Sequence, residues 1–198
     1  MKVYHYTKGM SLFSIFTDGF IATENKRGLS GFKRNTNCVW FTSKEAYPKT
    51  ALPCIPNMLS TNLMVHVENK SIAIDLDELG TYVGGVFRFA FDTNKHKGLM
   101  KWRDSSLRKQ AMQNRMWQAQ EQIANLVGDD ISKYWISSKD VPLFGVTLQQ
   151  YRGGWVDVLT DFDVRTLTIE QADVLDTLMT MSAADLRGKG LPLHHVKV

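Results

Sequence analysis

The sequence has few of the residues that build redox, disulfide or membrane structures. Two of its 198 residues are cysteines, Cys38 and Cys54, with no C-x-x-C pair and no histidine at ligand spacing beside them. Two isolated cysteines favour reduced thiols and a cytosolic location over a disulfide framework. No run of roughly 18 apolar residues predicts a membrane span, and the first residues lack the apolar segment of a signal peptide. We therefore expect a cytoplasmic protein without membrane contact.

Several common catalytic motifs are also missing. The sequence contains no P-loop, no G-x-G-x-x-G after a strand, no H-E-x-x-H and no G-x-S-x-G. Its glycine pairs, at 84–85 and 153–154, favour turns over phosphate cradles. The five histidines are scattered along the chain, so we expect no metal site. These absences exclude the most familiar nucleotide hydrolases, dinucleotide folds, zinc proteases and serine hydrolases.

The composition is that of an ordinary globular protein with a mildly basic balance. Apolar residues make up 43% and charged residues 22%, so residues 1–198 fit one domain with a sizeable core. The net charge of +4 is compatible with a polyanionic partner. Between positions 95 and 115 a single acid, Asp104, stands among the basic residues Lys95, Lys97, Lys101, Arg103, Arg108, Lys109 and Arg115.

The hydrophobic pattern predicts an α+β domain. Short apolar or alternating runs predict strands at 3–6, 38–42, 63–68, 71–76, 86–91, 134–136, 143–148 and 155–159. A helix is expected at 11–17, ended by Gly19, and the longest helix at 103–126. Thr168 and Gln171 fit a capping box that begins a last helix, to about 186. We expect a core over 1–160, a surface loop at 25–37 and a helical C-terminal extension over 161–198.

Polar side chains at the ends of two strands are the best candidates for a site. On an extended strand His5 and Thr7 share one face, and Tyr4 and Tyr6 take the other. The second strand ends in the aromatic and hydroxyl residues of the W-F-T-S segment at 40–43. A histidine beside a threonine can bind a ribose or an amide. The alternative is a polar strand end whose hydrogen bonds are satisfied by neighbouring backbone.

The segment H-Y-T-K-G-M-S-L-F-S-I-F-T-D-G-F-I, followed by V-W-F-T-S and Thr50-Ala51, resembles ADP-ribosyltransferase-like proteins. That group includes DNA-targeting toxins of the DarT type and tRNA 2′-phosphotransferases. A closer likeness is to uncharacterised bacterial and phage proteins that open with H-Y-T…G…W-F-S…T-A. Further short matches, spread up to position 159, are Arg88-Phe89, Trp102, Val141-Pro142-Leu143 and Gly154-Trp155. The resemblance implies split antiparallel sheets with one long central helix and a C-terminal helix.

The resemblance also implies that NAD is bound as a substrate. The residues it assigns to NAD are His5, Tyr6, Thr7, Arg27, Arg34, Trp40, Thr42, Ser43 and Tyr47. Among them, His5 and Thr7 would bind the nicotinamide-side ribose or amide. Tyr47 or Trp40 would stack on the nicotinamide ring, and Arg27 or Arg34 would meet the pyrophosphate, which suits a guanidinium.

Cleavage of the glycosidic bond of NAD passes through an oxocarbenium-like state, so a carboxylate beside the ribose is needed. The sequence has Pro48 where the related proteins carry the glutamate of W-E-x-T-A. Glu45 and Glu68, at strand edges, are the catalytic candidates beside His5. The other acids weighed are Glu121 in the long helix, Glu170 in the capping box and Asp157 in a strand that faces either way.

The basic block has two interpretations. It is either a solvated helix face or a surface that holds nucleic acid through phosphate contacts of Lys101, Arg103, Arg108, Lys109 and Arg115. The leading hypothesis is an NAD-binding ADP-ribosyltransferase-like protein that modifies a macromolecular target. The alternative is a non-enzymatic inhibitor or binding module of phage or mobile-element origin that contacts nucleic acid or a host protein.

Overall fold

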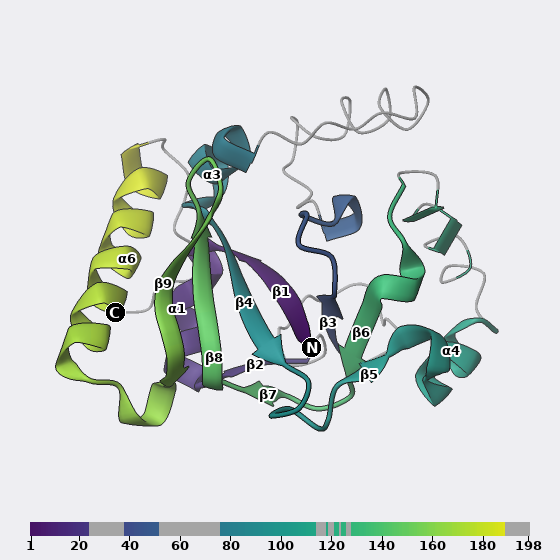
Figure 1. Cartoon of the computed structure of the whole chain (residues 1–198). Helices are drawn as coiled ribbons and strands as arrows, with labels where there is room; N and C mark the ends of the chain where they lie inside the picture. The colour runs from purple at the N-terminus through teal and green to yellow at the C-terminus, as the bar shows by residue number, and fades with distance from the viewer. Residues whose placement is uncertain are drawn as a thin grey trace.

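The computed structural model describes residues 1–23, 38–51, 76–113, 118, 121–122, 124–125 and 128–188. Its main feature is an antiparallel sheet of seven strands in the order β5-β6-β3-β1-β4-β8-β9, next to a two-stranded sheet of β2 and β7 (Figure 1). Helices pack against this sheet, so the expected α+β class is confirmed.

The strands mostly match the sequence pattern. In the large sheet they are β1 (Lys2–Lys8), β3 (Val39–Thr42), β4 (Val86–Asp92), β5 (Met100–Lys101), β6 (Tyr134–Ser137), β8 (Phe144–Tyr151) and β9 (Trp155–Asp163). The small sheet pairs β2 (Phe20–Ile21) with β7 (Val141–Pro142). The expected strand at 63–68, and residues 71–75 of the next one, lie outside the described residues.

Two helices end or begin where their capping residues predict. Helix α1 (Gly9–Asp18) stops at Gly19, whose φ of 75° favours glycine and whose N–H donates to the Ile15 carbonyl. Helix α6 (Ile169–Gly188) begins with a reciprocal pair of bonds: Thr168 N–H donates to Gln171 Oε1, and Gln171 N–H donates to Thr168 Oγ1. The predicted capping box is therefore confirmed. No helix in the described part of the chain is long and apolar enough to cross a membrane.

Helix α3 (Leu76–Val83) was not expected, because its glycine at position 80 and the pair at 84–85 were interpreted as turns. Leu79 and Val83 are buried in a small cluster with Val86, and this packing outweighs the low helix propensity of Gly80. A Cβ at Gly80 would lie 3.7 Å from the Gly85 Cα, so the small residue suits the close approach of the next segment.

The single long helix expected at 103–126 is wrong. The chain forms a 3-10 helix, η3 (Trp102–Asp104), and then a six-residue helix, α4 (Ser106–Ala111), which is capped by Ser105 Oγ and followed by a turn. In one continuous helix, Arg108 and Glu121 would be about 20 Å apart. Here Arg108 Nε lies 2.8 Å from Glu121 Oε1, so the chain folds back and buries Trp102 between the two parts.

One face of the large sheet, the core face, packs on α1 and α6. It carries Val3, His5, Phe41, Phe87, Phe89, Phe91 and Leu148, which alternate along their strands as period two requires. Leu175 and Leu178 of α6 join this cluster, so the helix expected as an extension completes the core. In Figure 1, α1 lies behind β8 and β9, and α6 runs beside β9. The opposite face of the sheet is the front face.

His96, in the turn after β4, gives the fold a pH dependence. The side chain is 6% exposed between Phe91 and Phe144, and its buried Nε2 has no hydrogen-bond partner among the described residues. Burial lowers the pKa of His96 from its ordinary 6.5, although a bond to the Phe144 backbone and the charge of Asp92 oppose this. Because the unfolded chain binds the proton more readily, we expect stability to be full above pH 6.5 and to fall as the pH drops below it.

Urea unfolding of the wild type and of His96→Leu between pH 7.5 and 5 would measure this effect. The wild type should lose about 1.4 kcal/mol of stability relative to the variant for each unit by which its pKa is lowered. A difference between the two proteins that does not change with pH would contradict the prediction.

Candidate functional site

The front face carries a row of polar side chains that runs across four neighbouring strands. Tyr6 of β1 is the register partner of Arg88 in β4, Arg88 that of Gln149 in β8, and Gln149 that of Asp157 in β9. Direct cross-strand partners project to the same face, and hydrogen bonds join all four. Arg88 Nη1 donates to Tyr6 Oη at 3.2 Å, Arg88 Nε to Gln149 Oε1 at 2.6 Å, and Gln149 Nε2 to Asp157 Oδ1 at 2.5 Å.

Arg88 is the centre of this row. The residue is 4% exposed, and its guanidinium lies 4.1 Å from the centre of the Tyr4 ring and 4.2 Å from that of Trp155. Aromatic faces on both sides stabilise a desolvated cation. None of the described carboxylates forms an ion pair with it, and no described group accepts from Nη2. Within the described residues, the two N–H groups of Nη2 are therefore not used by the fold.

The chain segment after β3, residues 43–47, is fixed over the row. Arg88 Nη1 donates to the Glu45 carbonyl at 2.6 Å, and Tyr6 Oη lies 2.7 Å from the same carbonyl. The Tyr47 ring packs edge-on against Tyr6 at 5.1 Å. The exposed Glu45 side chain reaches back to Tyr4, whose hydroxyl donates to Oε1 at 3.4 Å. A carboxylate thus lies beside the arginine-aromatic cluster.

Burial extends the pH range over which the tyrosines of this cluster stay neutral. It raises the pKa of Tyr6 to about 12, and the neighbouring Arg88 only partly offsets this effect. Burial likewise raises the pKa of Tyr4 and of Tyr47. Neutral hydroxyls both donate and accept hydrogen bonds, so at neutral pH these groups suit recognition of oxygen-rich ligands.

A second polar centre lies on the same face at β6, two strands from β1. Tyr4 is the register partner of Thr42 in β3, and Thr42 that of Tyr134 in β6. The Tyr134 hydroxyl donates to Asp129 Oδ2 at 2.9 Å, and the Thr50 hydroxyl lies 2.8 Å from the same oxygen. Asp129, 7% exposed, also accepts from the backbone N–H groups at the start of the 3-10 helix η2 (Lys49–Ala51).

The sheet divides the predicted NAD-binding residues between its two faces. His5 and Thr7 belong to the core face; His5 is 9% exposed, packs near Phe41, and has Nδ1 2.9 Å from the Trp40 carbonyl. Residues of the same predicted set on the front face, or on the segment that covers it, are Tyr6, Trp40, Thr42 and Tyr47. The Trp40 ring packs at a tilt against Trp102, with ring centres 4.7 Å apart, away from the Arg88 cluster.

The hydroxyls at the end of β3 are engaged by the backbone. Thr42 Oγ1 accepts from Lys44 N–H, and Ser43 Oγ donates to the Lys133 carbonyl. Of the two predicted catalytic glutamates, Glu45 lies at the Arg88 cluster, and Glu68 lies outside the described residues. Arg27 and Arg34, expected at the pyrophosphate, are outside them too.

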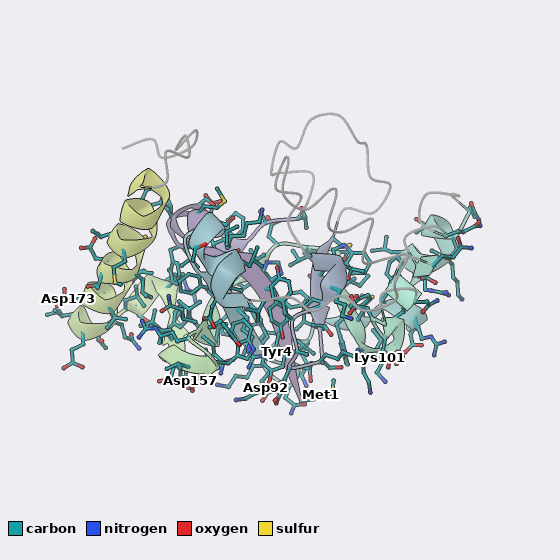
Figure 2. All side chains as sticks on the ribbon, turned by 90° about the horizontal axis from the view of Figure 1, so that it is seen from above. Met1, Tyr4, Asp92, Lys101, Asp157 and Asp173 are labelled. Carbon is teal, nitrogen blue, oxygen red and sulfur yellow. The ribbon has the colours of Figure 1, made fainter. Side chains whose placement is uncertain are left out.

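The basic block is divided as well. Arg108 binds Glu121 through two hydrogen bonds of 2.8 Å, so it is part of the fold. Lys101, Arg103 and Lys109 are exposed at the β5 end of the sheet, and Arg115 lies outside the described residues. In Figure 2, Lys101 and the acidic Asp173 lie on opposite sides of the molecule.

Arg88, Gln149, Asp129 and Trp155 were not predicted as site residues. The sequence does contain a signal for Arg88. This arginine interrupts the apolar run at 86–91, and strand alternation places it on the face opposite to the three phenylalanines of that run. A cation in that position requires partners on the second face of the sheet. The sequence pattern does not determine which face of the sheet Asp157 occupies. In the structure it lies on the front face together with Tyr4 and Asp92 (Figure 2).

Comparison of the chain with protein-family models, with curated proteins and with solved structures gives no match. The candidate site is therefore inferred from its geometry alone. Within the ranges that the structure describes, no group of three or more histidine, cysteine or acidic residues could hold a metal ion.

Proposed function

We propose that this chain is an ADP-ribosyltransferase-like protein that binds NAD at the Arg88 cluster and transfers ADP-ribose to a macromolecular target. The observation that carries the proposal is the buried Arg88 guanidinium, held between two aromatic rings, with the Glu45 carboxylate beside it. A dinucleotide requires this combination: a cation for phosphate oxygens, a flat surface for a ring and an anion near the ribose.

The residues present have chemistry that fits these three tasks. Arg88 Nη2 would donate to a phosphate oxygen, because Nε and Nη1 are already used by Gln149, Tyr6 and the Glu45 carbonyl. Trp155 or Tyr47 would stack on the nicotinamide. The Glu45 carboxylate would stabilise the positive charge that develops at the ribose as nicotinamide leaves.

Glu45→Gln tests the proposal with little risk to the fold, because the side chain is exposed. We expect the variant to bind NAD but to release nicotinamide about 100-fold more slowly, since the anion that stabilises the transition state is lost. Titration calorimetry measures the binding of NAD, and chromatography measures the release of nicotinamide. Glu170→Gln, on the exposed start of α6, is the matched control and should retain full activity. A wild-type protein that neither binds NAD nor releases nicotinamide would refute the function.

A nucleic-acid contact at the β5 end is the second candidate, favoured by the segregation of charge. Exposed basic residues on β5, η3, α4 and the turns that flank β6 are Lys101, Arg103, Lys109, Lys133 and Lys139, and they outnumber the exposed acids there, Asp104 and Asp130. Exposed acids gather instead on β9 and α6, at Asp157, Asp161, Glu170, Asp173 and Asp176. A polyanionic strand would be attracted to the first end and repelled from the second.

Replacing Lys101, Arg103 and Lys109 together by glutamine should weaken binding of labelled single-stranded DNA or RNA. The slope of log affinity against log salt should become shallower by about 2, because each lost phosphate contact removes roughly 0.7. The same triple replacement of the exposed Lys2, Arg152 and Arg165 is the control. Equal effects of both triple variants, or binding insensitive to salt, would argue against this surface.

A further inference from the structure

Thr50, Asp129 and Tyr134 have the arrangement of an activated hydroxyl. The Thr50 side chain is exposed, and its hydroxyl donates to the buried Asp129 carboxylate at 2.8 Å and lies 2.6 Å from the Tyr134 hydroxyl. A nucleophile and a base within hydrogen-bond reach, with the base oriented by further groups, is the general pattern of a reactive hydroxyl. Here the orienting groups are the N–H groups of Lys49 and Thr50, at 3.2 and 2.9 Å from the two Asp129 oxygens.

This centre lies close to the Arg88 cluster. Tyr4 and Tyr134 project from the same face with one strand between them, so their Cα atoms are about 10 Å apart. Each hydroxyl contacts one side chain of the segment 45–50, Tyr4 that of Glu45 and Tyr134 that of Thr50. The Glu45 carboxylate and the Thr50 hydroxyl therefore lie on the same face, at tyrosines separated by one strand, and a ribose beside the first would extend towards the second.

We propose that Thr50 is an acceptor of ADP-ribose, so that the protein modifies itself at this hydroxyl. The inference rests on the proposed NAD-dependent function. Thr50 Oγ forms a bond to C1′ of the nicotinamide ribose, and the C1′–N bond breaks. Nicotinamide leaves as a neutral molecule with the bonding electron pair, and the hydroxyl proton passes to Asp129 and from there to solvent. Asp129 acts as general base, and Tyr134 is a positioning residue that holds the hydroxyl and the carboxylate together.

Self-modification would also affect the site itself. Thr50 lies five positions after Glu45 on the segment that Tyr6 and Arg88 hold against the sheet. An ADP-ribosyl group on Thr50 would occupy the front face and introduce two phosphates near the Arg88 cation. The modified protein should therefore bind a second NAD more weakly than the unmodified protein does.

The test incubates the full chain with NAD, follows nicotinamide release, and locates any ADP-ribose adduct by mass spectrometry of the peptide that contains Thr50. We expect an adduct at Thr50 in the wild type and in Thr50→Ser, which keeps the hydroxyl. Thr50→Val should lose the adduct at this position but keep nicotinamide release by transfer to water. Asp129→Asn, which keeps an acceptor oxygen for the η2 backbone, should slow adduct formation at least tenfold.

The outcomes separate this inference from the function on which it rests. Nicotinamide release by the wild type without an adduct at Thr50, or an adduct that persists at full rate in Asp129→Asn, overturns the self-modification alone. No nicotinamide release by the wild type overturns the proposed function and the self-modification together. An adduct in the wild type and in Thr50→Ser that Thr50→Val lacks supports both.

Discussion

Arg88→Met is expected to lower the free energy of unfolding by about 3 kcal/mol, because it removes the cationic donor that three part-buried acceptors share. Gln149 Oε1, the Tyr6 hydroxyl and the Glu45 carbonyl all accept from the guanidinium, and a hydrogen bond to a charged group contributes roughly 1.5–3 kcal/mol. The bond between the Tyr6 hydroxyl and the Glu45 carbonyl remains and limits the loss. The contacts with the Tyr4 and Trp155 rings are lost as well, at about 1 kcal/mol. Some of this loss is regained because methionine needs no hydration.

Thermal and urea unfolding measure the effect, and the midpoint of thermal unfolding should drop by roughly 6–12 °C for a chain of this size. Arg152→Met is the matched control, because Arg152 is exposed in the β8–β9 turn and its side chain bonds only Gln150 among the described residues. It should cost less than about 0.5 kcal/mol. Equal stability losses for the two variants would show that the row across the sheet contributes little.

A graded response along the row distinguishes a connected network from independent contacts. Asp157 is exposed, so Asp157→Asn should cost less than about 1 kcal/mol, since a screened carboxylate contributes little. Combined with Arg88→Met, the effect of Asp157→Asn should shrink further, because Gln149 no longer links the aspartate to a cation. Additive losses in the double variant would contradict the network.

The faces of the strands could be predicted from the sequence, and the partners of their side chains could not. Period two alone places Phe87, Phe89 and Phe91 together and Arg88 opposite them, and the structure has this arrangement. It also separates His5 from Tyr6, as predicted. The pattern of one strand does not reveal which strand lies beside it, however. The row from Tyr6 to Asp157 joins positions 6, 88, 149 and 157, and such long-range pairing has no local signal.

Local signals succeeded where a single residue determines the backbone. Gly19 ends α1 because its φ of 75° is unfavourable for other residues, and Thr168 with Gln171 begins α6 through bonds three residues apart. They failed where packing between distant segments decides. The apolar stripe at 103–126 is compatible with one helix, but Ala111 and Ala124 both pack in the cluster around Trp102. The chain must turn between them to bury that tryptophan on both sides.

Trp102→Ala is expected to cost about 4 kcal/mol, because this side chain is the centre of the second core. It is 1% exposed, packs at a tilt against Trp40 with ring centres 4.7 Å apart, and donates from Nε1 to Glu121 Oε1 at 2.9 Å. Removing a buried tryptophan loses its burial and leaves a cavity. Trp102→Phe keeps one aromatic ring but loses the donor and part of the buried volume, so it should cost about 2 kcal/mol, less than the alanine variant. Urea unfolding of both variants measures the two contributions.

The bond to Glu121 can be tested separately through pH. Burial alone would raise the pKa of Glu121, but hydrogen bonds from Arg108 and Trp102 and the charge of Arg108 lower it below its ordinary 4.5. The unfolded chain therefore binds the proton more readily, so this stabilisation is full above pH 4.5 and is lost as the pH falls further. Trp102→Phe should reduce that loss, because it removes a donor that lowers the pKa of Glu121. Glu121→Gln should abolish it, because glutamine does not titrate.

A double-mutant cycle between Trp102→Phe and Glu121→Gln should give a coupling of about 1 kcal/mol at pH 7. Strictly additive losses would mean that Trp102 is held by packing alone.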